Sequence, residues 1–266
     1  MKKIKFLAVA AILIIGTAAC NKQKKSSSNA AKKGWTLVWE DDFDKSMDET
    51  IWSKMPAGKK NMNRYMNDND GLFIFQDGNL ILRGVKNSTP TDDMPFLTGG
   101  ITTEGKKTLA AHSRIEVRAR MNPVAGTTPY ITLLPVTKDE NISIDVMERY
   151  GIDEFIYQSV SSEYTTTGGM PDNPASSALV GVNPNQYHVY GVERYADSVV
   201  FFVNDLRTKK YPRILTEMPG QFPFSDQEYE LFIGLRLNKD TEPDSLPVDL
   251  FIDWVRYYEP DTETAE

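Results

Sequence analysis

From Trp35 onward, this chain is dominated by short stretches in which apolar and polar residues alternate, separated by turn residues. The clearest is the stretch 114–120, Arg-Ile-Glu-Val-Arg-Ala-Arg, where every second side chain is apolar. Because successive side chains of a β-strand point to opposite sides, such alternation predicts a strand with one apolar face. A chain built of such stretches has to bury one face of each, which favours an all-β sandwich.

Further strands are predicted at 72–75, 80–82, 187–190, 199–203, 229–237 and 250–257. The first two are joined by an Asp77-Gly78 turn, which is typical of a tight hairpin. The segment 165–185 is rich in Thr, Gly, Pro and Ser and is predicted to be a long loop. Because no helical period and no second composition zone interrupts this pattern, residues 34–260 are predicted to form one domain, with residues 261–266 as a tail.

The segment 142–148, Ile-Ser-Ile-Asp-Val-Met-Glu, carries the most informative chemistry. Alternation places Ser143 and Asp145 on one face of a strand and apolar side chains on the other. The alternation breaks by one residue at Met147, which predicts a β-bulge that returns Glu148 to the polar face. Alternate residues of a strand are about 6.6 Å apart, so such a strand presents a row of polar side chains.

This strand resembles the active-site strand of glycoside hydrolase family 16, whose pattern is Glu-x-Asp-x-x-Glu. Other segments are similar to strands of that family, in the same order: 35–43, 63–65 with 77–80, 100–103, 113–119, 187–193, 201–204 and 252–258. The resemblance covers nearly all of residues 35 to 258. It implies an all-β, concanavalin-like β-jelly-roll sandwich of two antiparallel sheets, with a concave glycan cleft.

The same resemblance implies roles for the motif. In the family, the first Glu attacks the anomeric carbon, the Asp tunes it and the last Glu is the acid/base. Asp145 and Glu148 match the last two positions, but Ser143 stands at the nucleophile position. An unactivated hydroxyl is a poor nucleophile and does not stabilise an oxocarbenium ion as a carboxylate does, so we expect impaired hydrolysis. Asp139 and Glu140 precede the strand, but Glu140 would need a second bulge to reach this face.

Other positions depart from the family in the same region. Thr132 stands where the family usually has Trp, and Gly234 where it usually offers Asn. None of the four tryptophans falls in the central segments that supply a family cleft; they are Trp35, Trp39, Trp52 and Trp254. Tyrosine rings then remain as platforms for sugars. The candidate substrate-binding residues are Tyr130, Thr132, Tyr150, His188 and Arg236. His188 is explained equally well as a structural histidine, and Arg236 as a charge at the rim.

Residues 1–19 have the features of an export signal. Three early lysines precede an apolar run that is too short to span a bilayer, and small residues follow it. Cys20, directly after them, resembles a bacterial lipoprotein processing site. This implies a lipid on Cys20 and a location in the bacterial cell envelope, at the outer membrane. The alternative is ordinary cleavage near Ala19 with Cys20 left free. Residues 20–33 are polar and are predicted to be a flexible tether.

The chain has a net charge of −7, and removal of the basic signal would make it more acidic. An acidic chain without a basic stripe argues against nucleic-acid binding. It favours a neutral glycan of the β-glucan type, unless a local basic cleft overrides the overall charge. With two histidines and one cysteine, no transition-metal site is expected. Family members often hold a structural calcium, to which Asp253 could contribute; no other cofactor is expected. We expect a monomer.

Three functions remain open from the sequence. The first is a lipoprotein that binds a neutral β-glucan-type polysaccharide without efficient hydrolysis. The second is an active endo-β-glucanase-like enzyme that hydrolyses O-glycosyl bonds with Glu148 as acid/base. The third is a structural lipoprotein whose jelly roll contacts another protein.

Overall fold

A computed structural model of the chain describes residues 32–58, 64–91 and 93–261. The predicted signal, Cys20, nearly all of the tether and residues 262–266 of the tail lie outside the described residues. Within those ranges the helices are two single turns, η2 (Asp70–Leu72) and η3 (Pro243–Ser245), and neither has the length to cross a membrane.

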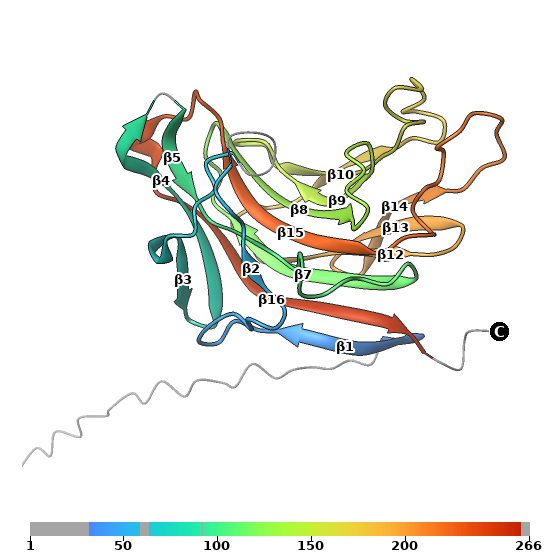
Figure 1. The fold of residues 1–266 in the computed structure, drawn as a ribbon, viewed down its shortest axis with the longest axis horizontal. Coiled ribbons are helices and arrows are strands. Elements are labelled where there is room, and N and C mark those ends of the chain that lie inside the picture. Colours follow the sequence, from blue (N-terminus) through green and yellow to red (C-terminus); the bar gives the residue numbers. More distant parts are fainter. Residues whose placement is uncertain (1–31, 59–63, 92, 262–266) are drawn as a thin grey trace, which may run out of the picture. The chain divides into compact units, whose positions relative to one another are not determined.

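The described strands form two antiparallel sheets, which confirms the predicted all-β sandwich (Figure 1). The nine-stranded sheet has the order β14-β13-β12-β7-β16-β4-β3, with β1 beside β16 and β5 beside β4. Its strands are β1 (Trp35–Asp41), β3 (Phe73–Gln76), β4 (Asn79–Thr91), β5 (Met94–Thr98), β7 (Ser113–Met121), β12 (His188–Arg194), β13 (Ser198–Val203), β14 (Leu206–Pro212) and β16 (Val248–Pro260).

The seven-stranded sheet has the order β11-β10-β9-β8-β15-β6-β2. Its strands are β2 (Ser53–Lys54), β6 (Gly100–Thr102), β8 (Thr127–Pro135), β9 (Ser143–Glu148), β10 (Phe155–Ser161), β11 (Ser177–Gly181) and β15 (Tyr229–Leu237).

Most of the predicted strands and the predicted hairpin turn are present. The stretches 114–120, 229–237 and 250–257 lie within β7, β15 and β16. Asp77 and Gly78, between β3 and β4, have φ of 53° and 70°, the left-handed values that a two-residue hairpin turn of type I′ requires.

The predicted long loop at 165–185 is partly wrong, because it contains strand β11. This strand lies at the edge of its sheet and pairs only with β10. Its side chains alternate between exposed and half-buried, so it has no buried apolar face to mark it in the sequence.

The hydrophobic core lies between the two sheets. Figure 1 shows β8, β9 and β15 of the seven-stranded sheet layered over β7 and β16 of the nine-stranded sheet. Fully buried side chains from both sheets meet in one cluster, among them Ile131, Leu133, Ile144, Val146, Ile115, Val117, Leu250 and Ile252. Burying one such side chain contributes about 1.5–3 kcal/mol. The apolar face of β9 is thereby fixed against the core, and its polar face points outward.

Candidate functional site

The outer face of the seven-stranded sheet, which is turned away from the core, carries the predicted catalytic row. Ser143, Asp145 and Glu148 are half-buried, whereas the residues between them are fully buried. The predicted bulge is present: Val146 and Met147 together oppose a single residue of β8 and a single residue of β10. The extra residue brings Glu148 back to the face of Asp145, as the broken alternation indicated.

Among the described residues, Ser143 bonds to one carboxylate, that of Asp145. Its hydroxyl donates to Oδ2 of Asp145 over 3.3 Å, and Ser161 of β10 is its cross-strand neighbour. Asp139 and Glu140 are exposed in the turn before β9, where Asp139 accepts a bond from the backbone N–H of Asn141. Within the described residues, Asp145 is therefore the carboxylate that Ser143 contacts, and the matched nucleophile position holds a hydroxyl.

Asp145 is surrounded by hydroxyl groups. Thr132 of β8 donates to its Oδ1 and Ser159 of β10 to its Oδ2, each over 3.0 Å. Burial and, second, the nearby Glu148 carboxylate raise the pKa of Asp145 to about 6, although the three hydroxyl donors act in the opposite direction. Asp145 thus exchanges its proton in mildly acidic solution rather than near pH 4.

Both oxygens of Glu148 have partners. Nη2 of Arg236, on β15, donates to Oε1 in an ion pair, and the Tyr150 hydroxyl donates to Oε2 over 2.9 Å. Burial and the adjacent Glu148 raise the pKa of Tyr150 to about 12, so its phenol remains a donor. Both contacts thus place a donor against the Glu148 carboxyl group. In this state Glu148 is arranged as an acceptor.

Two of the predicted substrate-binding residues are covered. Tyr130 is fully buried and its hydroxyl donates to the Met55 sulfur over 3.4 Å, in a small cluster with Met66 and Phe232. The prediction that the Tyr130 ring is a sugar platform is wrong, because other side chains cover the ring. Thr132 is also buried, and its hydroxyl supports Asp145.

Gly234 explains how Tyr130 fits. A Cβ at this position, where the family usually offers Asn, would lie 2.5 Å from the Tyr130 hydroxyl oxygen and 2.8 Å from the Met66 methyl carbon. The space of a side chain at residue 234 is therefore filled by Tyr130 and Met66.

The prediction that His188 binds the glycan is wrong. Its strand, β12, belongs to the nine-stranded sheet, whereas the predicted catalytic row lies on the seven-stranded sheet. Its ring nitrogens lie 3.1 Å from the Asn183 carbonyl oxygen and 2.9 Å from the Asn204 amide nitrogen. These contacts fit the structural alternative that the sequence left open.

An aromatic row beside Glu148 consists of Tyr150, a candidate named from the sequence, and of Tyr157 and Phe155, which sequence reasoning missed. The ring centroids of Tyr150 and Tyr157 are 5.0 Å apart, and those of Tyr157 and Phe155 are 5.5 Å apart. Tyr157 is the cross-strand neighbour of Glu148. The available signal was the spacing of Phe155 and Tyr157, since residues two apart in a strand share one face. Aromatic faces are the groups on which pyranose rings stack.

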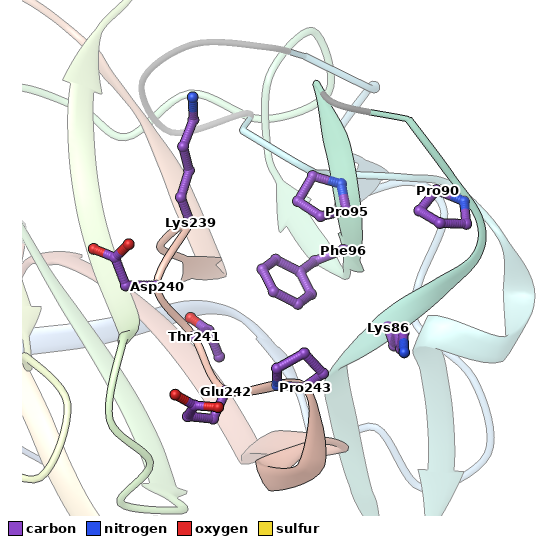
Figure 2. Close-up of a pocket in the computed structure, with 9 residues that line it drawn as sticks. All are labelled: Lys86, Pro90, Pro95, Phe96, Lys239, Asp240, Thr241, Glu242 and Pro243. Atoms are coloured by element: carbon purple, nitrogen blue, oxygen red, sulfur yellow. The ribbon is translucent and has the colours of Figure 1, made fainter.

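Two pockets flank the segment that follows β15. The first, which we call the arginine pocket, is lined by Arg64, Thr128, Tyr150, Arg236, Leu237 and Asn238. It includes both side chains that bond to Glu148. The second, shown in Figure 2, is lined by Lys86, Pro90, Pro95, Phe96 and residues 239–243. The arginine pocket is therefore the one that adjoins the predicted catalytic row.

No metal centre is apparent in the described part of the chain, where no group of three or more His, Cys, Asp or Glu side chains could hold an ion. Asp253, the residue predicted to contribute to a calcium site, is buried and forms an ion pair with Arg118. Its carboxylate is thus engaged within the nine-stranded sheet.

Two curated proteins resemble the chain in sequence, although no protein-family model matches it. A keratan-sulfate endo-1,4-beta-galactosidase of Sphingobacterium multivorum is 26% identical over 251 residues, which cover 88% of this chain and 57% of that protein. The chain thus spans little more than half the length of that relative. A beta-glucanase of Rhodothermus marinus is 24% identical over 281 residues, which cover 97% of this chain and 96% of that protein.

Solved structures show the same fold. A non-specific endo-beta-1,3(4)-glucanase from family GH16 superposes with a TM-score of 0.76 at 17% identity, covering 86% of this chain and 93% of that one. A Glu-to-Ser mutant of that glucanase, which presents 1,3-beta-D-cellobiosyl-glucose at its active site, superposes with a TM-score of 0.73 at 17% identity, covering 86% and 96%. The predicted jelly-roll fold and the resemblance to family 16 are confirmed.

Proposed function

We propose, from the jelly-roll fold that this chain shares with family GH16 glucanases, that it binds a β-glucan-type polysaccharide on the outer face of its seven-stranded sheet without efficient hydrolysis. The observation that carries this proposal is the hydroxyl of Ser143 at the matched nucleophile position, bonded to Asp145. Loss of a carboxylate nucleophile removes the covalent route of a retaining glycosidase, which typically costs several orders of magnitude in rate.

Three observations support glycan binding on this face. The aromatic row offers ring faces, and Asp145 and Glu148 offer carboxylate acceptors for sugar hydroxyls. The curated relatives are named for enzymes acting on polysaccharides. The Glu-to-Ser mutant of the similar glucanase holds an oligosaccharide at its active site, so serine is compatible with an occupied site in that protein. The mixed polar and aromatic face also argues against the third function, which calls for a shallow apolar surface.

Binding and turnover should be measured separately on purified protein. We expect affinity electrophoresis or calorimetry to detect binding to laminarin, mixed-linkage β-glucan or a β-galactan, with little release of reducing sugar. The variant Ser143→Glu should release more reducing sugar from the glycan that the unaltered protein binds, because it supplies a carboxylate in the same row. Absence of binding to all three glycans by the folded protein would refute the proposal.

A second candidate is an active glycoside hydrolase with Glu148 as acid/base. The pairing of Asp145 and Glu148 on one face of β9 favours it, since two carboxyl groups beside one another are the machinery of glycosidases. An inverting route would use a water instead of a nucleophile, and needs carboxyl groups about 6.5–9.5 Å apart. Efficient turnover by the unaltered protein that disappears in Glu148→Gln would select this candidate over the first.

We also propose that the protein is a monomeric lipoprotein of the bacterial cell envelope, anchored at the outer membrane through Cys20. The export-type signal and the small residues before Cys20 support this. Expression in a bacterial host with labelled palmitate should label the protein in the membrane fraction, and Cys20→Ser should abolish the label. A labelled Cys20→Ser variant would contradict the anchor.

A further inference from the structure

We propose that the arginine pocket binds an anionic substituent of the glycan, a sulfate ester or a carboxylate, through Arg64 and Arg236. This inference rests on the proposed function and narrows it, because it assigns the glycan a negative charge next to the catalytic row. The neutral glycan expected from the overall charge then becomes the weaker ligand.

Arg236 can serve Glu148 and a ligand at the same time. Its Nη2 donates to Glu148, and its guanidinium carbon lies 5.1 Å from the Tyr130 ring centroid, so the buried ring supports the plane of the group. A guanidinium has five N–H donors in a fixed fork. Glu148 occupies one nitrogen, and in the described residues no other acceptor bonds to this guanidinium, whose side chain is 26% exposed.

Arg64 provides a positive charge that no carboxylate of the described residues compensates. Its side chain is half-buried and lines the same pocket as Arg236, although the two residues are far apart in the sequence. Across the described ranges, no Asp or Glu forms an ion pair with it, in contrast to Arg83, Arg114 and Arg118. With Glu148 balancing Arg236, the pocket keeps one net positive charge.

The lining of the arginine pocket suits an oxyanion. Thr128 and Asn238 add a hydroxyl and an amide to the two guanidinium groups, and the described residues that line the pocket include no carboxylate. Arginine pairs with sulfate-like and carboxylate groups through two parallel hydrogen bonds, which gives selectivity as well as affinity.

The neighbouring pocket provides a contrast. Figure 2 shows two lysines, Lys86 and Lys239, together with Asp240 and Glu242, so its formal charges cancel. The whole chain carries a net charge of −7, yet the arginine pocket has the opposite sign. A cationic pocket on an acidic surface is a local feature that net charge does not reveal. One curated relative is named for a sulfated glycan, keratan sulfate, which agrees with this assignment.

The test compares matched glycans and matched variants. Calorimetry or affinity electrophoresis of the full chain should use keratan sulfate, chemically desulfated keratan sulfate, hyaluronan as a carboxylate-bearing polymer, and laminarin as a neutral one. Arg64→Ala removes the uncompensated charge, whereas Arg64→Lys keeps the charge but lacks the paired N–H donors of a guanidinium. Lys210→Ala on β14 removes one positive charge from the other sheet. Thermal melting confirms that each variant folds.

We expect at least one of keratan sulfate and hyaluronan to bind about tenfold or more tightly than the desulfated and neutral polymers, and Arg64→Ala to abolish that preference. Arg64→Lys should keep part of the preference for the anionic polymer, and Lys210→Ala should keep all of that preference. Added salt should weaken binding of the preferred polymer selectively, a readout that needs no variant. Tighter binding of keratan sulfate would identify the anionic substituent as a sulfate ester, and tighter binding of hyaluronan would identify it as a carboxylate.

Equal binding of charged and neutral glycans, or a preference that survives Arg64→Ala, overturns the inference but leaves the proposed function standing. No binding to any of these four polymers overturns the inference, and the proposed function is refuted as well when mixed-linkage β-glucan and a β-galactan also fail to bind.

Discussion

The hydroxyl of Ser143 lies 3.3 Å from Oδ2 of Asp145 and donates a hydrogen bond to it. In the family that this chain resembles, the position of Ser143 carries the attacking carboxylate. Here it carries a donor that supports the neighbouring acid. A hydroxyl next to Asp145 favours the charged form of that acid, whereas a second carboxylate would oppose it. Ser143, which stands in place of the nucleophile, therefore also changes the electrostatics of the catalytic row.

The first prediction concerns the hydroxyl donors of Asp145. Ser159→Ala and Ser143→Ala should each raise the pKa of Asp145 further, since each removes a donor that lowers it. The effect of Ser159→Ala should be larger, because its bond is shorter, 3.0 Å against 3.3 Å. Carboxyl-carbon NMR titration of labelled aspartate measures both values. A lowered pKa in either variant would be incompatible with this account.

The second prediction concerns stability and pH. Burial raises the pKa of Asp145 in the folded state above its unfolded value, so the folded state binds more protons between about pH 4 and 6. The contribution of Asp145 to the unfolding free energy is therefore present at low pH and is lost as the pH rises through this window. Urea unfolding at several pH values should show Asp145→Asn gaining stability relative to the unaltered protein across it. A constant difference would argue against the raised pKa.

The third prediction concerns the ion pair of Arg236 and Glu148. A double-mutant cycle with Arg236→Met and Glu148→Gln should give a coupling free energy of about 1–2 kcal/mol in urea unfolding. Burial is only partial, with 26% and 16% of the two side chains exposed, so the value stays below that of a fully buried pair. The pair of Lys54 and Asp70, whose carboxylate is fully exposed, is the control and should give a smaller coupling free energy. Equal coupling in both pairs would contradict the prediction.

The fourth prediction concerns the filled space at Gly234. Gly234→Ala should destabilise the fold by about 1–3 kcal/mol, because its Cβ would meet Tyr130 and Met66. Gly181→Ala, in the same sheet, has no atom within 4 Å of the added carbon and should be nearly neutral. Adding Tyr130→Phe removes the atom at 2.5 Å and should recover part of the loss. Thermal and urea unfolding measure the stability of each variant. Unchanged stability of Gly234→Ala would show that Tyr130 and Met66 move aside for the added carbon.

The fifth prediction concerns the aromatic row. Tyr157→Ala should weaken glycan binding roughly tenfold, with unchanged melting temperature within a few degrees, because a half-exposed stacking face is lost. Tyr187→Ala is the control, since that phenol bonds to Asn79 of the nine-stranded sheet. Calorimetry with the glycan that binds best measures the difference. Equal affinity in both variants would remove Tyr157 from the binding surface.

The sequence determined the fold class and the order of residues on β9. Period-two alternation requires a strand with one buried face, and the break at Met147 predicted the bulge that aligns Glu148 with Asp145. These features are local, because they depend on which way successive side chains of one strand point. The resemblance to family 16 added the arrangement of the sheets, which periodicity alone does not give.

Only the tertiary structure decided what covers each side chain. Tyr130 is buried because Met66 and a glycine on a neighbouring strand leave room for its ring, and His188 is excluded because its strand pairs in the other sheet. The contact of Arg236 with Glu148 and the meeting of Arg64 and Arg236 in one pocket join segments distant in the chain. Alternation tells which face a residue takes, but which strands become neighbours, and which loop lies beside them, is settled only when the whole core packs.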